Sequence, residues 1–489
     1  MLLLLALGVF SYFIFYTQFL LDNHAFRMPW LAENEQVQNG RWMGPVIGWL
    51  HYGANVPVVM PGLSLAAALA SVFIIIRSYG SDFQRDSLFI FGAIIIVCPI
   101  NLAFYYYGFM SPIFFIANLL ACVAAALLTQ FSIRRLVSAS IVVVFMLATY
   151  QAAIGALAVL VVTGVIWRAC ESPGSKSDDA GSVLSQIVRV WSPALGAFVA
   201  TTIGLMIYLW TIQYLPDNGK AIDLADFGAL VERIREVSFA AFRHLIITQP
   251  DILNALNVGF GILVVLAAFT SLVAARENAV GVISLVLAWP SVILASKAIF
   301  YISDPGNIYQ YRYNSGLIYL YGFAGLLVSH HFRAGLARIA AVGLSAFVIV
   351  VSVQADLVRQ HVLMRGQERD LSTFNRILYR IETLENFDPS VRYDLIRVGA
   401  LPRYRLQLLR SRGRNWDELG DGHMDYGEIS DIWVDDHVFG LLGSSVRLTY
   451  GRKQSAAEIV EEGLLDEREP WPAPSSVFID GERIIVYVD

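Results

Sequence analysis

An acidic residue directly follows the first long apolar run of the chain. Residues 2–21 are predominantly apolar, and Asp22 is the first charged side chain of the sequence. A carboxylate held at the end of an apolar helix is partly removed from water, which raises its proton affinity and suits it to act as a base. Such a residue can equally well end the helix in water, so the position alone leaves both roles open.

The segment after Asp22 contains more groups that could bind a substrate. Arg27 and Arg41 offer guanidinium groups for phosphate oxygens. His24 lacks companions at metal-ligand spacing, so no metal site is predicted here. The polar run at 33–35 favours solvated side chains. Four further side chains are candidate contacts to a sugar: Asn23, Glu33, Glu35 and Trp42.

A second candidate region is the tyrosine-rich segment 301–313. Arg312 lies there beside three tyrosines, Tyr309, Tyr311 and Tyr313. Guanidinium binds phosphate oxygens in pairs, and phenols supply hydrogen bonds and flat faces for sugars. Tyrosines also gather at the headgroup level of membranes, and the pattern fits that interpretation as well. Lys297, just before the segment, either reaches toward water or joins this phosphate site.

A polar pair, Tyr150 and Gln151, interrupts the apolar stretch 136–167. These side chains could line a cavity, although hydrogen bonding between helices is the commoner role of such groups. The sequence contains no P-loop, dinucleotide fingerprint or G-x-S-x-G, which argues against nucleotide-driven transport and serine hydrolysis. No cofactor is predicted, and a divalent metal has no support in the spacing of His and Asp residues.

The elements that must position these residues are predicted to be membrane helices. The chain is 56% hydrophobic and only 15% charged, against about a quarter charged in soluble domains. About 20 apolar residues in a helix cross a bilayer. The sequence therefore predicts a polytopic α-helical membrane protein with eleven windows: 2–21, 55–76, 87–106, 112–131, 136–150, 152–167, 191–214, 252–274, 279–300, 314–330 and 337–355.

The distribution of basic residues predicts the orientation of these helices. With Met1 inside, the inside loops hold ten Lys and Arg and the longer outside loops seven, as the positive-inside rule requires. The outside segments are then 22–54, 215–250 and 301–313. If windows 136–150 and 152–167 formed one helix, every segment after them would lie on the opposite side of the membrane. Within 215–250, apolar residues recur at helical spacing among charged ones, which predicts a helix lying at the interface.

A charged C-terminal part follows the last window. Residues 1–355 hold 34 charged residues and 356–489 hold 41, so we predict a transmembrane domain 1–355 and a small α+β domain 356–489 outside the membrane. Apolar spacing predicts a helix around 368–386. Asp480-Gly481 between apolar runs predicts a hairpin. Neither part has the concentrated basic surface of a nucleic-acid binder.

The order of these residues resembles the bacterial glucosyl transferase family of serotype conversion, the Gtr type II family. The resemblance depends on Asp22, Arg27, Trp30, Gly40-Arg41, Tyr150-Gln151 and the run Asn375-Arg376-Ile377-Leu378 five residues after Asp370. It implies a GT-C-like enzyme of the bacterial inner membrane that moves glucose from a polyprenyl-phosphate carrier to O-antigen at the outer face. The family usually has two adjacent acids where this chain has Asp22-Asn23, which leaves Asp22 as the single candidate base.

Chemistry consistent with this resemblance can be assigned to the candidate residues. We expect Asp22 to take the proton of an acceptor hydroxyl as it attacks the anomeric carbon, with inversion. Arg312, helped by Arg41 or Arg27, would stabilise the departing lipid phosphate. Two alternatives stay open, an O-antigen polymerase or ligase, and a transporter or flippase of lipid-linked sugars. Charges near the outer ends of the windows, with none at mid-depth, favour surface chemistry over transport.

Overall fold

The computed structural model describes residues 1–18, 37, 39–50, 57–80, 83–130, 132–171, 180–214, 227–246, 252–301, 313–332, 334–399, 442–443, 445–448 and 456–488. These residues divide into two compact units. The larger unit holds the described residues up to Val358, and the smaller unit holds those from Arg359 on.

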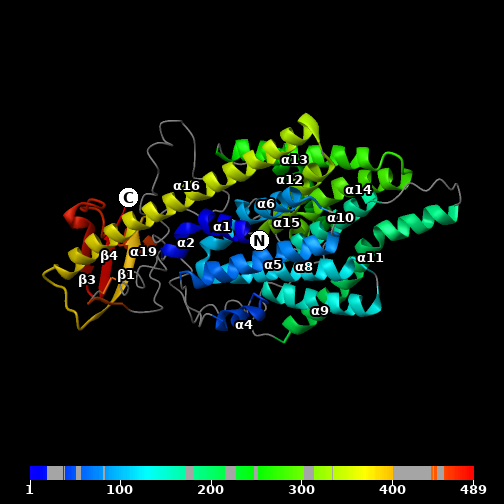
Figure 1. Cartoon of the computed structure of the whole chain (residues 1–489). Helices are drawn as coiled ribbons and strands as arrows, with labels where there is room; N and C mark the ends of the chain where they lie inside the picture. The colour runs from blue at the N-terminus through cyan, green and yellow to red at the C-terminus, as the bar shows by residue number, and fades with distance from the viewer. Residues whose placement is uncertain are drawn as a thin grey trace. The chain divides into compact units, whose positions relative to one another are not determined.

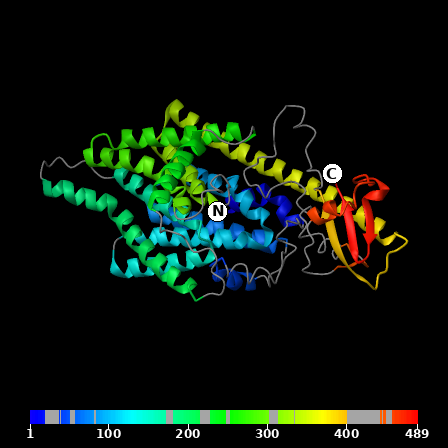
Figure 2. The same cartoon turned by 180° about the vertical axis from the view of Figure 1, so that it is seen from behind.

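The larger unit is built of helices (Figures 1 and 2). Its α-helices are α1 (Leu2–Ser11), α2 (Phe13–Thr17), α4 (Met43–Trp49), α5 (Val59–Tyr79), α6 (Arg85–Val97), α7 (Ile100–Tyr106), α8 (Ser111–Leu128), α9 (Ile133–Thr149), α10 (Ala153–Glu171), α11 (Ala180–Ile212), α12 (Phe227–Ile246), α13 (Ile252–Ala274), α14 (Ala279–Ala295), α15 (Ser315–His331) and α16 (Gly335–Glu382), the last of which continues into the smaller unit. Two short 3-10 helices, η2 (Gly108–Met110) and η3 (Ala298–Tyr301), join them.

Six helices in the described part of the chain are long and apolar enough to cross a membrane, or seven if the bent pair α6 and α7 forms one span. Each of the eleven predicted windows contains helix, but the count of eleven spans is not confirmed. The reason is length: α9, α14 and α15 have 17 residues each, and the first window is divided between α1 and α2 at Tyr12. Large apolar side chains such as Phe198, Val265 and Phe269 are exposed on the outside of the unit, as on a lipid-facing surface.

The chain breaks between α9 and α10, at the position that decides the predicted orientation. Helix α9 ends at Thr149, and Tyr150 has extended backbone angles, φ −160° and ψ 113°. Helix α10 begins at Ala153. The windows 136–150 and 152–167 are therefore two helices, and the alternative of one long helix is wrong.

A second break separates α6 from α7, where the helix axis turns by 45°. Pro99 causes it, because proline disfavours a helical conformation in the preceding residue and lacks an N–H of its own; Cys98 is accordingly extended. The Asn101 Nδ2 donates hydrogen bonds to the carbonyl oxygens of Ile95 and Ile96, at 2.7 and 3.1 Å. The Tyr12 hydroxyl also donates to Ile96, at 3.0 Å. Asn101 thus stabilises the break by bonding from α7 to the last turn of α6.

Helix α15 lies at the centre of the larger unit. Every residue from Ser315 to Ser329 is buried. Glycines let its neighbours approach closely, as is common between membrane helices. A Cβ atom on Gly316 would lie 2.7 Å from the carbonyl oxygen of Gly155, and a Cβ on Gly155 would lie 3.2 Å from that of Ser296. These contacts bring the first turns of α10 and α15 together.

Replacing Gly316 by Leu is expected to lower the thermal stability of the protein strongly. The contact at 2.7 Å involves backbone, which cannot move aside, so the added side chain must push α15 away from α10. We expect a loss of at least several degrees in the unfolding temperature, measured in detergent. Gly343→Leu in α16 is the matched control, because a Cβ there meets nothing within 4 Å. Equal unfolding temperatures for the two variants would contradict the close contact.

Helix α12 lies inside the segment 215–250, where the sequence predicts an interfacial helix. One side of it is buried, at Val237, Ala240 and Ala241. Apolar residues on other positions, Val231 and Ile234, are exposed. This distribution suits a helix that packs against the larger unit on one side and contacts lipid at the membrane interface with other apolar residues.

The smaller unit contains the C-terminal end of α16 and a four-stranded sheet of order β2-β1-β4-β3. The elements are β1 (Arg392–Val398), β2 (Arg447–Leu448), α19 (Ala456–Glu461), η8 (Pro474–Ser476), β3 (Val477–Asp480) and β4 (Arg483–Tyr487). Strand β1 is parallel to β2 and β4, and β3 pairs with β4 as an antiparallel hairpin. Gly481 has φ +57° in the connecting turn, which confirms the hairpin predicted from Asp480-Gly481.

Apolar residues cover both faces of this sheet. Phe374, Ile377, Leu378 and Ile381 of α16 pack with Tyr393, Val477, Ile484 and Val486, which confirms the apolar face predicted for 368–386. Ile459 of α19 packs with Ile396, Phe478 and Ile485 on the other face.

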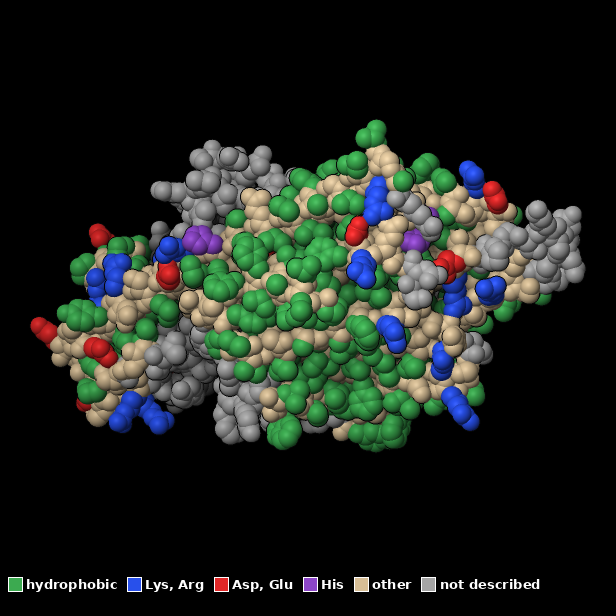
Figure 3. Space-filling view, in the orientation of Figure 1, with side chains coloured by type: hydrophobic (Ala, Val, Ile, Leu, Met, Phe, Trp, Pro, Cys, Tyr) green, Lys and Arg blue, Asp and Glu red, His purple; other side chains and the backbone are tan. Residues whose placement is uncertain are grey.

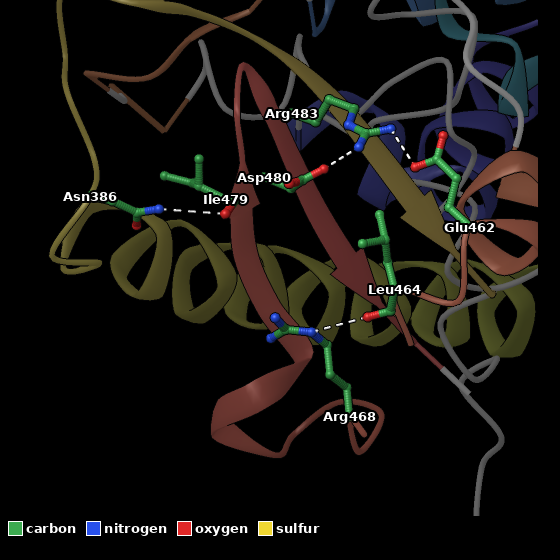
Figure 4. Close-up of polar contacts among 7 residues, drawn as sticks. All are labelled: Asn386, Glu462, Leu464, Arg468, Ile479, Asp480 and Arg483. Atoms are coloured by element: carbon green, nitrogen blue, oxygen red, sulfur yellow. Dashed lines mark hydrogen bonds and ion pairs between the residues drawn. The ribbon is translucent and has the colours of Figure 1, made fainter. Parts of the chain in front are cut away.

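Polar side chains stabilise the edge and the turn of the hairpin (Figure 4). Asn386 Nδ2 donates to the carbonyl oxygen of Ile479 at 3.4 Å. Arg483 pairs with Asp480, and also with Glu462 at 2.8 Å.

Candidate functional site

The structure describes five of the predicted site residues, and four of them come together. Arg41, Tyr150, Gln151 and Tyr313 form one cluster, and Trp42 lies beside it along the chain. The other predicted residues lie outside the described part of the chain: Asp22, Asn23, Arg27, Glu33, Glu35, Tyr309, Tyr311 and Arg312.

Gln151 is the centre of a hydrogen-bond network at the break between α9 and α10. Its Oε1 accepts from Arg41 Nε at 3.1 Å. Its Nε2 donates to the carbonyl oxygen of Asn39 at 2.8 Å and to the hydroxyl of Tyr208 at 2.7 Å. Both ends of the amide are therefore fixed, and with them the direction of the Arg41 guanidinium.

Tyr208, near the end of α11, holds the turn that precedes Arg41. Its hydroxyl donates to the carbonyl oxygen of Gly40 at 3.3 Å. Gly40 has φ +76°, and a Cβ atom there would lie 2.4 Å from the Tyr208 hydroxyl. Only glycine meets both conditions, the left-handed backbone and the absence of a side chain. Gly40 and Tyr208 thus set the position of Arg41.

Two tyrosines from separate segments form the aromatic part of the cluster. The rings of Tyr150 and Tyr313 lie 6.4 Å apart and nearly parallel, at 16°. The Arg41 Cζ lies 4.9 Å from the centre of the Tyr150 ring, within the range of a cation–π interaction. Phe114 and Phe300 contact Tyr150 and Tyr313 edge-on, at 4.7 and 6.0 Å. We call Tyr150 and Tyr313 the tyrosine pair.

A buried lysine lies close to the tyrosine pair. Lys297 and Asn314 are both 0% exposed. Lys297 Nζ donates to Asn314 Oδ1 at 2.5 Å and lies 5.8 Å from the centre of the Phe300 ring. Asn314 directly follows Tyr313, so this bond fixes the backbone that carries the second tyrosine. Charged side chains inside membrane proteins are costly and mark functional regions, and Lys297 does not reach outward as a snorkelling lysine would.

Trp42 lies at the edge of the cluster. Its ring packs against Phe145 of α9, with ring centres 5.8 Å apart. The indole Nε1 is buried and has no hydrogen-bond acceptor among the described residues. An indole N–H seeks a partner when buried, so this donor is a candidate contact to a ligand.

Tyr301 marks the start of the predicted segment 301–313. Its hydroxyl lies 3.4 Å from Ser238 Oγ, which ties η3 to α12. Burial raises the pKa of the Tyr301 phenol, and the bond with Ser238 opposes that shift. Tyr301 is therefore neutral at physiological pH and serves as a hydrogen-bonding group.

The sequence did not point to Tyr208 or Asn314 as site residues. Tyr208 lies inside an apolar window, and its role depends on α11 packing against the Gly40 turn. The dipeptide Asn39-Gly40 is a usable signal, since it favours a turn with positive φ. Asn314 gains its role from Lys297, seventeen residues earlier.

The sequence pattern of the GtrII glucosyl transferases matches residues 11–329. This match covers well over half of the chain and includes the whole cluster. The chain belongs to the GtrII glucosyl transferase family. Comparisons with curated proteins and with solved structures find no match.

Membership of the GtrII family confirms the resemblance drawn from the sequence, and it implies a glucosyltransferase that acts on surface polysaccharide. Such an enzyme needs a sugar donor and a polysaccharide or lipid acceptor. The apolar helices agree with a membrane protein. The match ends before α16, so the smaller unit lies outside it. Among the described residues, no three His, Cys, Asp or Glu side chains gather as metal ligands.

Replacing Tyr208 by Phe is expected to lower kcat/KM for glucosyl transfer about tenfold. The variant keeps the ring but loses the hydroxyl that bonds to Gln151 and Gly40, and a hydrogen bond contributes about 1 kcal/mol. Steady-state kinetics with purified enzyme measure the effect. Tyr214→Phe is the matched control, because Tyr214 follows the same helix and is exposed. Unchanged kinetics in Tyr208→Phe would show that the Gly40 turn does not position Arg41 for the reaction.

Proposed function

We propose that this GtrII family member transfers glucose, or a related hexose, from a polyprenyl-phosphate carrier to O-antigen or another surface polysaccharide. The reaction takes place at the periplasmic face of the bacterial inner membrane and inverts the anomeric centre. The observation that carries the proposal is the fixed guanidinium of Arg41 beside the tyrosine pair, inside the region that matches the family.

Arg41 is suited to bind the phosphate of the donor. Its Nε is held by Gln151, and the face of the guanidinium lies against Tyr150. A guanidinium fixed in this way loses little freedom when it binds a phosphate oxygen. Lys297, through its bond to Asn314, fixes the backbone that carries Tyr313. Arg312 and Arg27 are proposed as further phosphate contacts.

The aromatic groups are suited to bind the sugar. A hexose has apolar C–H faces that pack on rings and hydroxyl groups that need donors and acceptors, and tyrosine supplies both kinds of contact. The tyrosine pair and the Nε1–H of Trp42 provide them in the described cluster. We assign Asn23, Glu33, Glu35, Tyr309 and Tyr311 to the same sugar site.

The reaction is a single displacement. Asp22 takes the proton of the acceptor hydroxyl while its oxygen forms a bond to the anomeric carbon. The bond from that carbon to the phosphate oxygen breaks, and its electron pair leaves with the polyprenyl phosphate. Arg41, Arg312 and Arg27 stabilise the negative charge that develops on this leaving group. Attack from the face opposite the phosphate gives inversion.

The membrane arrangement follows from the donor and from the charge distribution. A polyprenyl chain stays in the bilayer, so its phosphate must be met at the headgroup plane. We propose eleven crossings for residues 1–355 with Met1 in the cytoplasm, which puts 22–54, 215–250, 301–313 and the domain 356–489 in the periplasm. That domain either docks the acceptor polysaccharide or covers the site.

Reconstitution tests the function directly. Purified protein in lipid nanodiscs is incubated with polyprenyl-phosphate glucose and an O-antigen acceptor, and the product linkage is determined by NMR. We expect covalent transfer of glucose with inverted configuration and release of polyprenyl phosphate. Movement of the lipid-linked sugar across the bilayer without transfer would favour a flippase, and polymer growth by whole repeat units would favour a polymerase.

A further inference from the structure

The larger unit has a cavity at the end of α10 opposite to Tyr150. Its volume is about 50 Å³, and it lies between α5, α8, α10 and α11. This volume holds several waters or the non-hydrogen atoms of about one phosphate group. The polar part of the lining is Ser78, Tyr79, Thr129, Trp167 and Arg168, and the rest is apolar.

Arg168 is held rigidly at the cavity wall. Pro193, inside α11, has no N–H and leaves the carbonyl oxygen of Arg189 without its helical partner. Arg168 Nη1 takes that place, donating to this oxygen at 2.9 Å and to Ser192 Oγ at 3.3 Å. Its Nη2 donates to the carbonyl oxygen of Thr129, which follows α8. The positive charge is therefore fixed in position by the helices around the cavity.

A second positive charge lies near the first. The carbonyl oxygen of Arg189 accepts the hydrogen bond from Arg168 Nη1 at 2.9 Å, so the two arginines are neighbours in the fold. Figure 3 shows Lys and Arg side chains gathered toward one end of the larger unit. The ends of α5, α8 and α10 that meet at the cavity carry or precede several arginines, among them Arg77 and Arg134, and the positive-inside rule assigns this end to the cytoplasm.

The aromatic residues that line the cavity are of the types found at the level of the lipid headgroups. The rings of Tyr79 and Trp167 lie 6.0 Å apart. Trp167 Nε1 donates to the carbonyl oxygen of Tyr79 at 3.0 Å, and the Tyr79 hydroxyl lies 2.6 Å from Thr163 Oγ1. Tyrosine and tryptophan favour the plane where lipid tails meet headgroups.

We propose that this cavity binds the phosphodiester headgroup of an anionic phospholipid from the inner leaflet, with its phosphate beside Arg168. Basic pockets between membrane helices at the cytoplasmic side are suited to anionic headgroups. The inference concerns the end of α10 remote from Arg41 and does not depend on the proposed glucosyl transfer.

A cavity-filling variant tests the site without touching either arginine. A Cβ on Gly164, which lines the cavity, meets nothing within 4 Å, so the side chain of Gly164→Leu has room to occupy the cavity. Gly343→Leu, also without a contact within 4 Å, is the control. The full-length variants are reconstituted with phosphatidylglycerol in phosphatidylcholine, and retained lipid is counted by native mass spectrometry.

We expect wild type and Gly343→Leu to retain phosphatidylglycerol in preference to phosphatidylcholine, and Gly164→Leu to lose that preference. Arg189→Gln should weaken retention about fivefold, the effect of about one surface charge. Equal retention by Gly164→Leu and wild type would overturn the proposal. So would displacement of the lipid by millimolar inorganic phosphate, because the cavity would then be a site for free phosphate. Glucosyl transfer is not the readout, so failure here leaves the proposed function untouched.

Discussion

Replacing Asp22 by Asn is expected to lower the rate of glucosyl transfer by about 10²- to 10⁴-fold, the usual contribution of a general base. The amide keeps the size of the side chain but cannot accept the proton of the acceptor hydroxyl. The rate of the wild-type enzyme should fall as the pH drops through the pKa of the base, because only the carboxylate form accepts a proton. The residual rate of Asp22→Asn should lose that dependence. Single-turnover kinetics over a pH series measure both effects.

The control for this variant is Asp86→Asn in the first turn of α6. The Asp86 carboxylate pairs with Arg338 at 2.7 Å, and its side chain is 63% exposed. Because exposed ion pairs contribute little, loss of this charge should leave glucosyl transfer nearly unchanged. Near-normal transfer by Asp22→Asn would instead remove Asp22 from the reaction and require a base elsewhere.

Replacing Arg41 by Gln is the second change with a large expected effect. We expect kcat to fall about 10²- to 10³-fold, as when one donor to a developing negative charge is lost. Gln151 and Tyr208 hold Arg41 before the substrate arrives, so the loss should appear mainly in kcat. Arg41→Lys should recover only part of the rate, because an ammonium cannot bond to Gln151 and present a flat face to Tyr150 at once.

Arg77→Gln provides a matched comparison for Arg41. Arg77 also lies over an aromatic ring, with its Cζ 5.8 Å from the centre of the Phe73 ring, but it belongs to the last turn of α5. Its replacement should leave kcat within about twofold of wild type. If Arg41→Gln were as active as Arg77→Gln, the phosphate would have to be bound by other residues.

Local signals in the sequence predicted much of the fold. The polar pair Tyr150-Gln151 marked a true helix break, and Asp480-Gly481 marked a true hairpin. Both depend on residues close together in the chain. The number of spans was not confirmed, because hydropathy windows do not show where a helix ends. Breaks at Tyr12 and Pro99 fall inside windows that are predominantly apolar.

The sequence predicted part of the described site. Arg41, Tyr150, Gln151 and Tyr313 were candidate site residues, but the sequence did not predict that Gln151 binds Arg41 or that Tyr150 lies beside Tyr313. Tyr208 and the Lys297–Asn314 bond depend instead on how α11, α14 and α15 pack. Spacing along a single chain does not reveal which side chains meet across three helices.

The bend between α6 and α7 has a consequence for hydration of the backbone. A break in an apolar helix frees carbonyl oxygens that must find other hydrogen-bond donors or water. Asn101 and Tyr12 occupy the freed carbonyls of Ile95 and Ile96 with their own N–H and O–H groups. The chain can therefore turn sharply at Pro99 without leaving these two carbonyl oxygens to be hydrated.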